Sequence, residues 1–227
     1  MTTLRQSITD WAKRWSTRTQ AEFRAIRRYP RDVRFRIFQT ADESACLEIY
    51  QSLKAGFPPN GTDNFLASLR HRDSAIVVAE REGVIIGMGG ISMSGENTAT
   101  LWYGLVSPAY QGSGIGTALT LFRLCTLPSD EFGVMIYTLR KSQGFYAKLG
   151  FQPWFEWDDG DGHKHPAALL DLAGFRRDFV LDALRDRGVV LDGTLVPRPP
   201  DEVRFDRVLQ SDGRHHFTYR QAVPLEG

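Results

Sequence analysis

Apolar residues along this 227-residue chain follow two spacings, and these predict a succession of strands and helices. Short apolar or alternating runs predict strands at 35–38, 75–79, 84–91, 98–106, 134–139, 151–157 and 167–172. Apolar residues three and four apart predict helices at 62–70, 114–126, 142–149 and 175–187. An earlier helix begins at a capping box of Thr40 and Glu43 and carries Cys46, Ile49, Tyr50 and Leu53 on one face. This order predicts an α/β (α+β) domain around a mixed sheet.

The first thirty residues predict a separate helical arm. Leu4, Ile8, Trp11 and Trp15 keep a helical spacing, and a second helical stretch ends at Pro30. Ten Lys or Arg against three Asp or Glu give residues 1–36 a charge of +7, whereas the whole chain carries +1. The arm is expected to pack its apolar stripe on the body, with contact to nucleic acid or another anionic surface, or a role in a homodimer, as alternatives.

These patterns divide the chain into three parts. We expect a basic helical extension at 1–33, the α/β domain at 34–173 and a C-terminal extension at 174–227. The last part holds a helix and a β-hairpin, whose strands at 203–209 and 216–223 flank a turn.

Composition excludes several classes of protein. Hydrophobic residues make up 42% and charged residues 24%, as in ordinary globular proteins, and no apolar run approaches the ~18 residues of a membrane span. Cys46 and Cys125 lie among apolar neighbours, so we expect buried, reduced thiols and a cytoplasmic protein. Two isolated cysteines exclude a disulfide scaffold and a multi-cysteine zinc site, and no metal is expected.

A glycine-rich segment lies between a predicted strand and a predicted helix. Gly112, Gly114 and Gly116 allow main-chain N–H groups to turn toward a ligand, and the following helix adds the positive end of its dipole. This pattern predicts a phosphate or pyrophosphate cradle, or else a structural turn. The spacing matches neither a Walker loop nor the dinucleotide-binding fingerprint.

The string Gln111-x-x-Gly114-x-Gly116 resembles motif A of the GNAT acyltransferase superfamily. Two further features fit that family. The preceding strand ends in Val106-x-Pro108, and the run Phe145-Tyr146-Ala147-Lys148-Leu149-Gly150-Phe151 begins 29 residues after Gly116. The resemblance covers about 34–173. It implies a mixed, mostly antiparallel central sheet flanked by helices.

The resemblance also implies roles for particular residues. Acetyl-CoA, the expected cosubstrate, would lie in an opening between the fourth and fifth strands that a bulge in the fourth strand creates. Backbone groups there would contact its pantetheine arm and thioester, and the glycine-rich loop would hold its pyrophosphate. The expected contacts are Leu105, Val106, Gln111, Gly112, Ser113, Gly114, Ile115, Gly116 and Thr117. Tyr146 would be the general acid that protonates the departing thiolate, or else a core aromatic residue.

The sequence departs from the family pattern at the general base. Strand 98–106 contains no carboxylate, although Glu96 precedes it, Glu80 lies on a neighbouring strand, and Thr100 or Tyr103 could hold a water chain. We expect an acetyl-CoA-dependent N-acetyltransferase in which a neutral primary amine attacks the thioester directly. The alternatives are a non-catalytic acyl-CoA-binding regulatory module and a nucleic-acid-associated protein that uses the basic arm.

Overall fold

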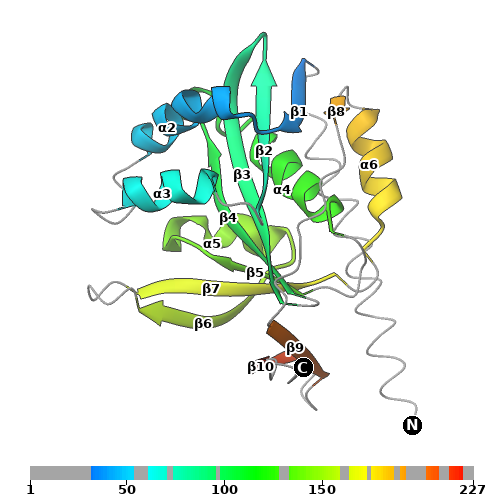
Figure 1. The fold of residues 1–227 in the computed structure, drawn as a ribbon. Coiled ribbons are helices and arrows are strands. Elements are labelled where there is room, and N and C mark those ends of the chain that lie inside the picture. The colour runs from blue at the N-terminus through cyan, green and yellow to red at the C-terminus, as the bar shows by residue number, and fades with distance from the viewer. Residues whose placement is uncertain are drawn as a thin grey trace, which may run out of the picture.

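One mixed sheet runs through most of the residues that the computed structural model describes, which are 32–53, 61–70, 74–95, 98–127, 133–158, 164–172, 175–186, 190–192, 203–209 and 215–221. Its strands are β1 (Val33–Ile37), β2 (Ser74–Arg81), β3 (Val84–Gly95), β4 (Thr98–Val106), β5 (Gly133–Tyr137), β6 (Gln152–Asp158), β7 (Lys164–Asp171) and β8 (Val190–Asp192). The helices are α2 (Glu43–Ser52), α3 (Gly61–Leu69), α4 (Ile115–Cys125), α5 (Gln143–Lys148) and α6 (Arg177–Arg185). Short 3-10 turns are η1 (Thr40–Asp42), η3 (Pro108–Tyr110) and η4 (Arg140–Ser142). Every helix and strand predicted between residues 35 and 187 is present (Figure 1).

The strand order is β6-β7-β5-β4-β3-β2-β1-β8. Neighbours pair antiparallel except β4 with β5 and β1 with β8, which are parallel. The parallel ladder of β4 and β5 runs only from the Thr98–Gly133 pair to the Leu101–Ile136 pair. Both strands continue past this point, so the sheet is open between their ends. The expected mixed, mostly antiparallel sheet with flanking helices is confirmed.

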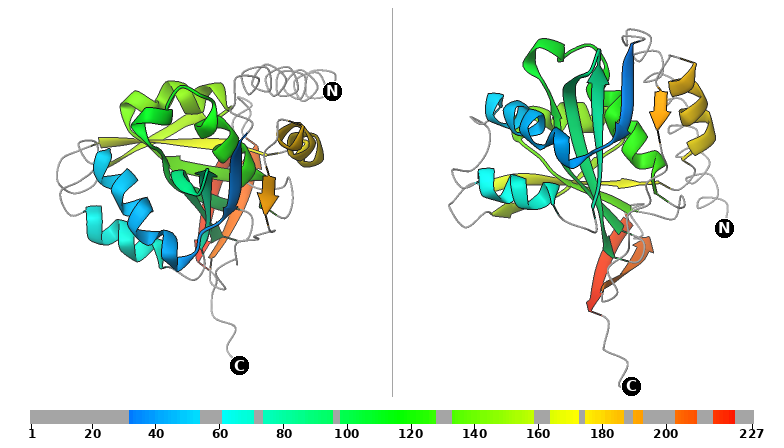
Figure 2. Two further views of the ribbon diagram at one scale, coloured as in Figure 1. Left: turned by 90° about the horizontal axis from the view of Figure 1, so that it is seen from above. Right: turned by 45° about the horizontal axis from the view of Figure 1, so that its top comes forward.

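Helices cover the sheet on both faces, as the view from above shows (Figure 2). In β2, Ala75, Val77 and Ala79 belong to the core beneath α4 and α6, whereas Ile76 and Val78 belong to the core beneath α2 and α3. This alternation follows from the two-residue period of a strand. The sheet therefore separates two apolar cores, and the central strands are apolar on both faces.

The two cysteines lie one in each core. Cys46 on α2 and Cys125 on α4 are buried and free, as the sequence predicts. Burial raises the pKa of each thiol to about 12. Both side chains are therefore protonated near neutral pH and act as small apolar groups.

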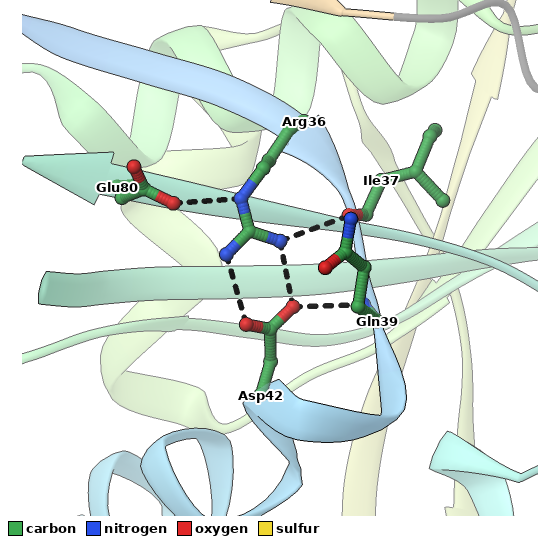
Figure 3. Close-up of polar contacts among 5 residues, drawn as sticks. All are labelled: Arg36, Ile37, Gln39, Asp42 and Glu80. Atoms are coloured by element: carbon green, nitrogen blue, oxygen red, sulfur yellow. Dashed lines mark hydrogen bonds and ion pairs between the residues drawn. The ribbon is translucent and has the colours of Figure 1, made fainter. Parts of the chain in front are cut away.

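The start of α2 differs from the prediction. Asp42, and not Glu43, caps the helical segment: its carboxylate accepts the Gln39 N–H at 2.8 Å and two N–H groups of Arg36 at 2.7 and 2.8 Å. Arg36 also donates to Glu80 at 2.6 Å, so one guanidinium joins β1, η1 and β2 (Figure 3). The turn begins one residue earlier than expected because an arginine from β1 fixes its acidic residue. Glu43 instead binds Arg70, beyond the end of α3, at 2.6 Å.

The segment that follows β7 packs against the sheet. Val180 and Leu184 on α6 are fully buried in the core that contains α4, and β8 pairs with the edge strand β1. The predicted C-terminal hairpin is present as β9 (Val203–Leu209) and β10 (His215–Gln221), which pair antiparallel. The N-terminal arm lies outside the described residues. Within the described part, no helix is long and apolar enough to span a membrane.

Candidate active site

A bulge in β4 determines the shape of the site. Met88 of β3 pairs with Leu105 and Gly90 pairs with Trp102, so two steps along β3 correspond to three along β4. The extra residue lies at Tyr103 and Gly104, and Tyr103 has a φ of +42°, which is rare for a bulky side chain. The bulge lies directly after the last pair that joins β4 to β5.

Aromatic rings from two helices support the bulge. The Tyr103 ring meets Phe65 of α3 at 5.0 Å and Tyr50 of α2 at 6.0 Å between centroids, both edge to face, and Tyr50 stacks on Phe65 at 4.5 Å. Edge-to-face packing of this kind stabilises a particular ring orientation. Helices α2 and α3 thus hold the strained residue in place and keep β4 bent away from β5.

Beyond the bulge, Val106 faces the opening. Ser107 N–H donates to the Ile86 carbonyl at 2.9 Å, which makes the flanking Gly87–Val106 pair a non-hydrogen-bonded pair of the antiparallel ladder. Such a residue directs its own N–H and C=O away from the partner strand. The Val106 carbonyl accepts the Gln111 side-chain amide at 3.0 Å, and its N–H points to the same side. Because hydrogen-bonded and non-hydrogen-bonded pairs alternate along the ladder, the N–H and C=O groups of the neighbouring Leu105 point toward β3 instead.

The glycine-rich loop leads from this opening to the N-terminus of α4. Gly112 and Gly114 have φ values of +76° and +89°, which glycine adopts without strain, and Gly114 is the N-cap of the helix. No acidic residue lies in the first turn of α4. The first N–H groups of a helix have no partner within it, so this end can receive an anion.

An open groove of about 960 Å³ runs along these elements. Seven of the nine residues expected to contact the cosubstrate line it, namely Leu105, Val106, Gln111, Gly112, Gly114, Gly116 and Thr117. Ser113 and Ile115 do not line it: the Ser113 hydroxyl donates to the Tyr110 carbonyl, and Ile115 is buried in the core. Their binding roles, and those of the seven, stay predictions.

The sequence-based reasoning missed the opposite wall of the groove. Lys141 and Ser142 of η4 and Lys148 of α5 line it, together with Phe145. The described lining residues include two lysines and no carboxylate. Lys148 belongs to the run that resembles the GNAT pattern, but nothing in the sequence distinguishes a lysine that faces a groove from one that faces solvent.

Tyr146 on α5 packs as a core aromatic residue and brings its hydroxyl to the bulge of β4, while its role as general acid stays a prediction. Its ring packs edge to face against Phe145 at 4.9 Å and Phe151 at 5.4 Å, as a core aromatic would. Its hydroxyl reaches the bulge, since a Cβ added to Gly104 would lie 3.1 Å from that oxygen. Gly104 lines the groove, whereas Tyr146 is not among the described lining residues.

A buried arginine lies at the same place and was also missed. Arg123 on α4 is 1% exposed, and its guanidinium lies beside Gly104 and the Tyr146 hydroxyl. Burial lowers the pKa of Arg123, and the nearby Tyr146 side chain opposes that change. The signal in the sequence was a single charge between Leu119 and Cys125 of α4, where Thr120 is the only other polar residue.

Comparison with known proteins agrees with this architecture. Residues 72–153, from β2 into β6, match the family model described as the acetyltransferase (GNAT) domain. An acetyltransferase of the GNAT family from Staphylococcus aureus Mu50 has a similar structure, with a TM-score of 0.51 and 16% identity over 62% of this chain and 99% of that one. The fold is that of a GNAT acetyltransferase.

Two further structures share the GNAT fold. The ribosomal-protein-S18-alanine N-acetyltransferase from Escherichia coli has a TM-score of 0.51 and 20% identity, over 62% of this chain and 94% of that one. An acetyltransferase from Streptococcus agalactiae 2603 has a TM-score of 0.52 and 13% identity, over 61% of this chain and 98% of that one. The resemblance found in the sequence is confirmed by the match of residues 72–153 to the GNAT family model and by the shared fold.

Among the described residues, each group considered as a general base or as a holder of a water chain has another interaction or is protonated. Glu80 is bound by Arg36 at 2.6 Å, and the Thr100 hydroxyl pairs with that of Ser94. Burial raises the pKa of Tyr103, which keeps its phenol protonated. Glu96 lies outside the described residues. Within the described part, no three His, Cys, Asp or Glu side chains form a group that could hold a metal ion.

Proposed function

We propose that this protein transfers an acetyl group from acetyl-CoA to a primary amine. The observation that carries the proposal is the end of the β4–β5 ladder at Leu101 and Ile136, followed by a bulge and a groove that leads to the N-terminus of α4. An extended cosubstrate with a thioester at one end and phosphates at the other fits this arrangement of an opening and a cradle.

The phosphate end suits the loop and the wall that faces it. Main-chain N–H groups between Gln111 and Thr117, the positive end of the α4 dipole, and the Lys141 and Lys148 side chains all favour an anion. Because the described lining residues include no carboxylate, nothing there opposes the phosphate charge.

The thioester end suits Val106 and Tyr146. The Val106 N–H faces the opening, where it can donate to the thioester carbonyl and stabilise the charge that develops on its oxygen. The amine nitrogen forms a bond to the carbonyl carbon, the C–S bond breaks, and the Tyr146 proton passes to the sulfur. The surplus proton of the new amide leaves to solvent, since no described groove residue is a carboxylate.

Calorimetry with a matched pair of glycine variants tests the cosubstrate assignment. Gly114→Asp places a negative charge where the pyrophosphate is held, and we expect a loss of at least ~2–3 kcal/mol in CoA binding. Gly83→Asp, in the β2–β3 turn, is the control: Gly83 has a φ of +79° and lies outside the groove, so it suffers similar backbone strain. Unchanged CoA affinity in folded Gly114→Asp would overturn the assignment.

The missing carboxylate in the described lining of the groove favours one second candidate, a regulatory module that binds acyl-CoA without turnover. A screen of amines, peptides and aminoglycosides with detection of released thiol separates the two. Thiol release with any acceptor supports the enzyme, and tight acetyl-CoA binding without release supports the module.

A further inference from the structure

Arg123 is a charge buried without a carboxylate among its contacts. It is 1% exposed, and its contacts are carbonyl and hydroxyl oxygens. Removing a cation from water costs several kcal/mol unless its hydrogen bonds are replaced. An apolar side chain would fill this position in α4 without that cost, so the guanidinium calls for a reason beyond packing.

Four hydrogen bonds hold the guanidinium inside the fold. Its Nε donates to the Leu119 carbonyl at 3.3 Å, and Nη1 donates to the carbonyls of Gly90 at 3.0 Å and Trp102 at 3.4 Å. Its Nη2 donates to the Thr120 hydroxyl at 3.2 Å, and the nearby Tyr146 side chain opposes the effect of burial on the pKa of Arg123. The guanidinium has five N–H groups, one more than these four acceptors take up.

A guanidinium beside a phenol oxygen restricts how the phenol can orient. The two groups lie side by side at the bulge, because a Cβ on Gly104 would lie 3.0 Å from Nη2 and 3.1 Å from the Tyr146 oxygen. An arginine side chain has donors and no acceptor, so the phenol favours an orientation with its oxygen lone pairs toward Arg123 and its proton away from it. Gly104 also lines the groove, so both groups lie next to the groove wall at the bulge.

Glycines make the room for this arrangement. A Cβ on Gly89 of β3 would lie 2.7 Å from the Arg123 Cζ, closer than real Cβ contacts. The guanidinium thus occupies space that side chains on β3 and β4 would otherwise fill, directly behind the bulge.

We propose that Arg123 is a positioning residue that acts through Tyr146: it occupies the acceptor side of the phenol oxygen, so that the phenol proton is presented to the departing thiolate. This inference rests on the proposed acetyl transfer. The guanidinium also places a fixed positive charge near the sulfur as negative charge develops there.

A double-mutant cycle separates this role from simple packing. Arg123→Met should lower kcat by about 10- to 100-fold and leave the KM for acetyl-CoA within about threefold. In a Tyr146→Phe background the same change should lower kcat by less than about threefold, because the hydroxyl it acts through is absent. Arg123→Lys, which keeps a charged donor, should recover part of the lost rate. Arg185→Met on α6 controls for the loss of one exposed positive charge.

A spectroscopic measurement gives a readout besides turnover. In protein labelled with ¹⁵N-arginine, the Arg123 side-chain N–H resonances should be protected from exchange and should shift in Tyr146→Phe. Thermal unfolding establishes that each variant is folded, and Arg123→Gln replaces Arg123→Met if the latter is not.

The possible results distinguish a failure of the positioning role of Arg123 from a failure of the proposed acetyl transfer. Coupling between the two substitutions supports the positioning role. An unchanged kcat in Arg123→Met, or the same fold-loss in both backgrounds, overturns it while the wild type still turns over. A wild type that binds acetyl-CoA and releases no thiol overturns the proposed function itself, and the role of Arg123 with it.

Discussion

At position 146 a single tyrosine joins the core of the domain to the opening in its sheet. The ring is fixed by Phe145 and Phe151, and the oxygen lies at the bulge of β4. A side chain held by packing at one end and used at the other can keep a reactive group in position with little entropy to lose.

This geometry makes Tyr146→Phe an informative change, since it removes one oxygen and keeps the packing. A general acid acts when the C–S bond breaks, so we expect kcat to fall about 10²-fold or more, while CoA affinity stays within a few-fold of the wild type. Steady-state kinetics and calorimetry measure the two quantities. Turnover at the wild-type rate, with chemistry limiting, would leave Tyr146 a packing residue only.

The residues of the site were predictable to different degrees. The main-chain contacts follow from a local pattern, because a glycine-rich turn before a helix dictates where N–H groups point. Arg123, Lys141 and Lys148 could not be found in that way. Their part depends on which elements pack around them, and for Arg123 the acceptors come from β3 and β4 as well as from its own helix.

Among the elements, the start of α2 is the clearest case of a distant contact overriding a local signal. The local pattern Thr40-x-x-Glu43 predicts one cap, and the arginine of β1 selects another by binding Asp42. The strands and helices themselves were predicted well, because two-residue and 3.6-residue periods report directly on burial. Their pairing order, and the docking of β8 on β1, depend on contacts between distant parts of the chain that no local period encodes.

The Arg36–Asp42 pair predicts a stability that depends on pH. The hydrogen bonds from Arg36 lower the pKa of Asp42 in the folded protein, and the Gln39 N–H adds to this, while burial opposes it. Asp42→Asn should cost about 2–3 kcal/mol in free energy of unfolding at pH 7. The carboxylate stabilises the fold above its unfolded pKa of about 4 and ceases to do so as pH falls through its lower folded pKa, so the wild type and the variant should converge in acid.

Urea unfolding between pH 7 and pH 3 measures this convergence. Glu156→Gln, which removes an exposed partner of Arg140, should cost less than about 1 kcal/mol and serves as the control. A difference between the wild type and Asp42→Asn that is constant across this range would contradict the assignment.

On the scale of the whole molecule, the segment after β7 is part of the core. Leu184 of α6 is 0% exposed within the cluster that includes α4, whereas Phe179 on the same helix is 37% exposed, with Arg176 over its ring. The family model ends at residue 153, and the packed structure extends well past it.

Two alanine substitutions on α6 test this extent. Leu184→Ala should lower the free energy of unfolding by about 2–5 kcal/mol, because it leaves a cavity in the core. Phe179→Ala should cost clearly less, since much of its ring already meets water. Urea titration measures both, and equal, small effects would show that α6 contributes little to the core.

The outermost strands of the sheet bear on whether a further chain can pair with it. An exposed strand edge is a template for another chain, and β6 carries two adjacent aromatic residues, Trp154 and Phe155. The register of β6 shifts between Pro153 and Phe155, and proline offers no N–H to an incoming strand. At the other edge β8 spans only Val190–Asp192. Among the described residues, neither edge offers a long, regular row of donors and acceptors, so the sheet gives an incoming strand little to pair with beside the aromatic pair on β6.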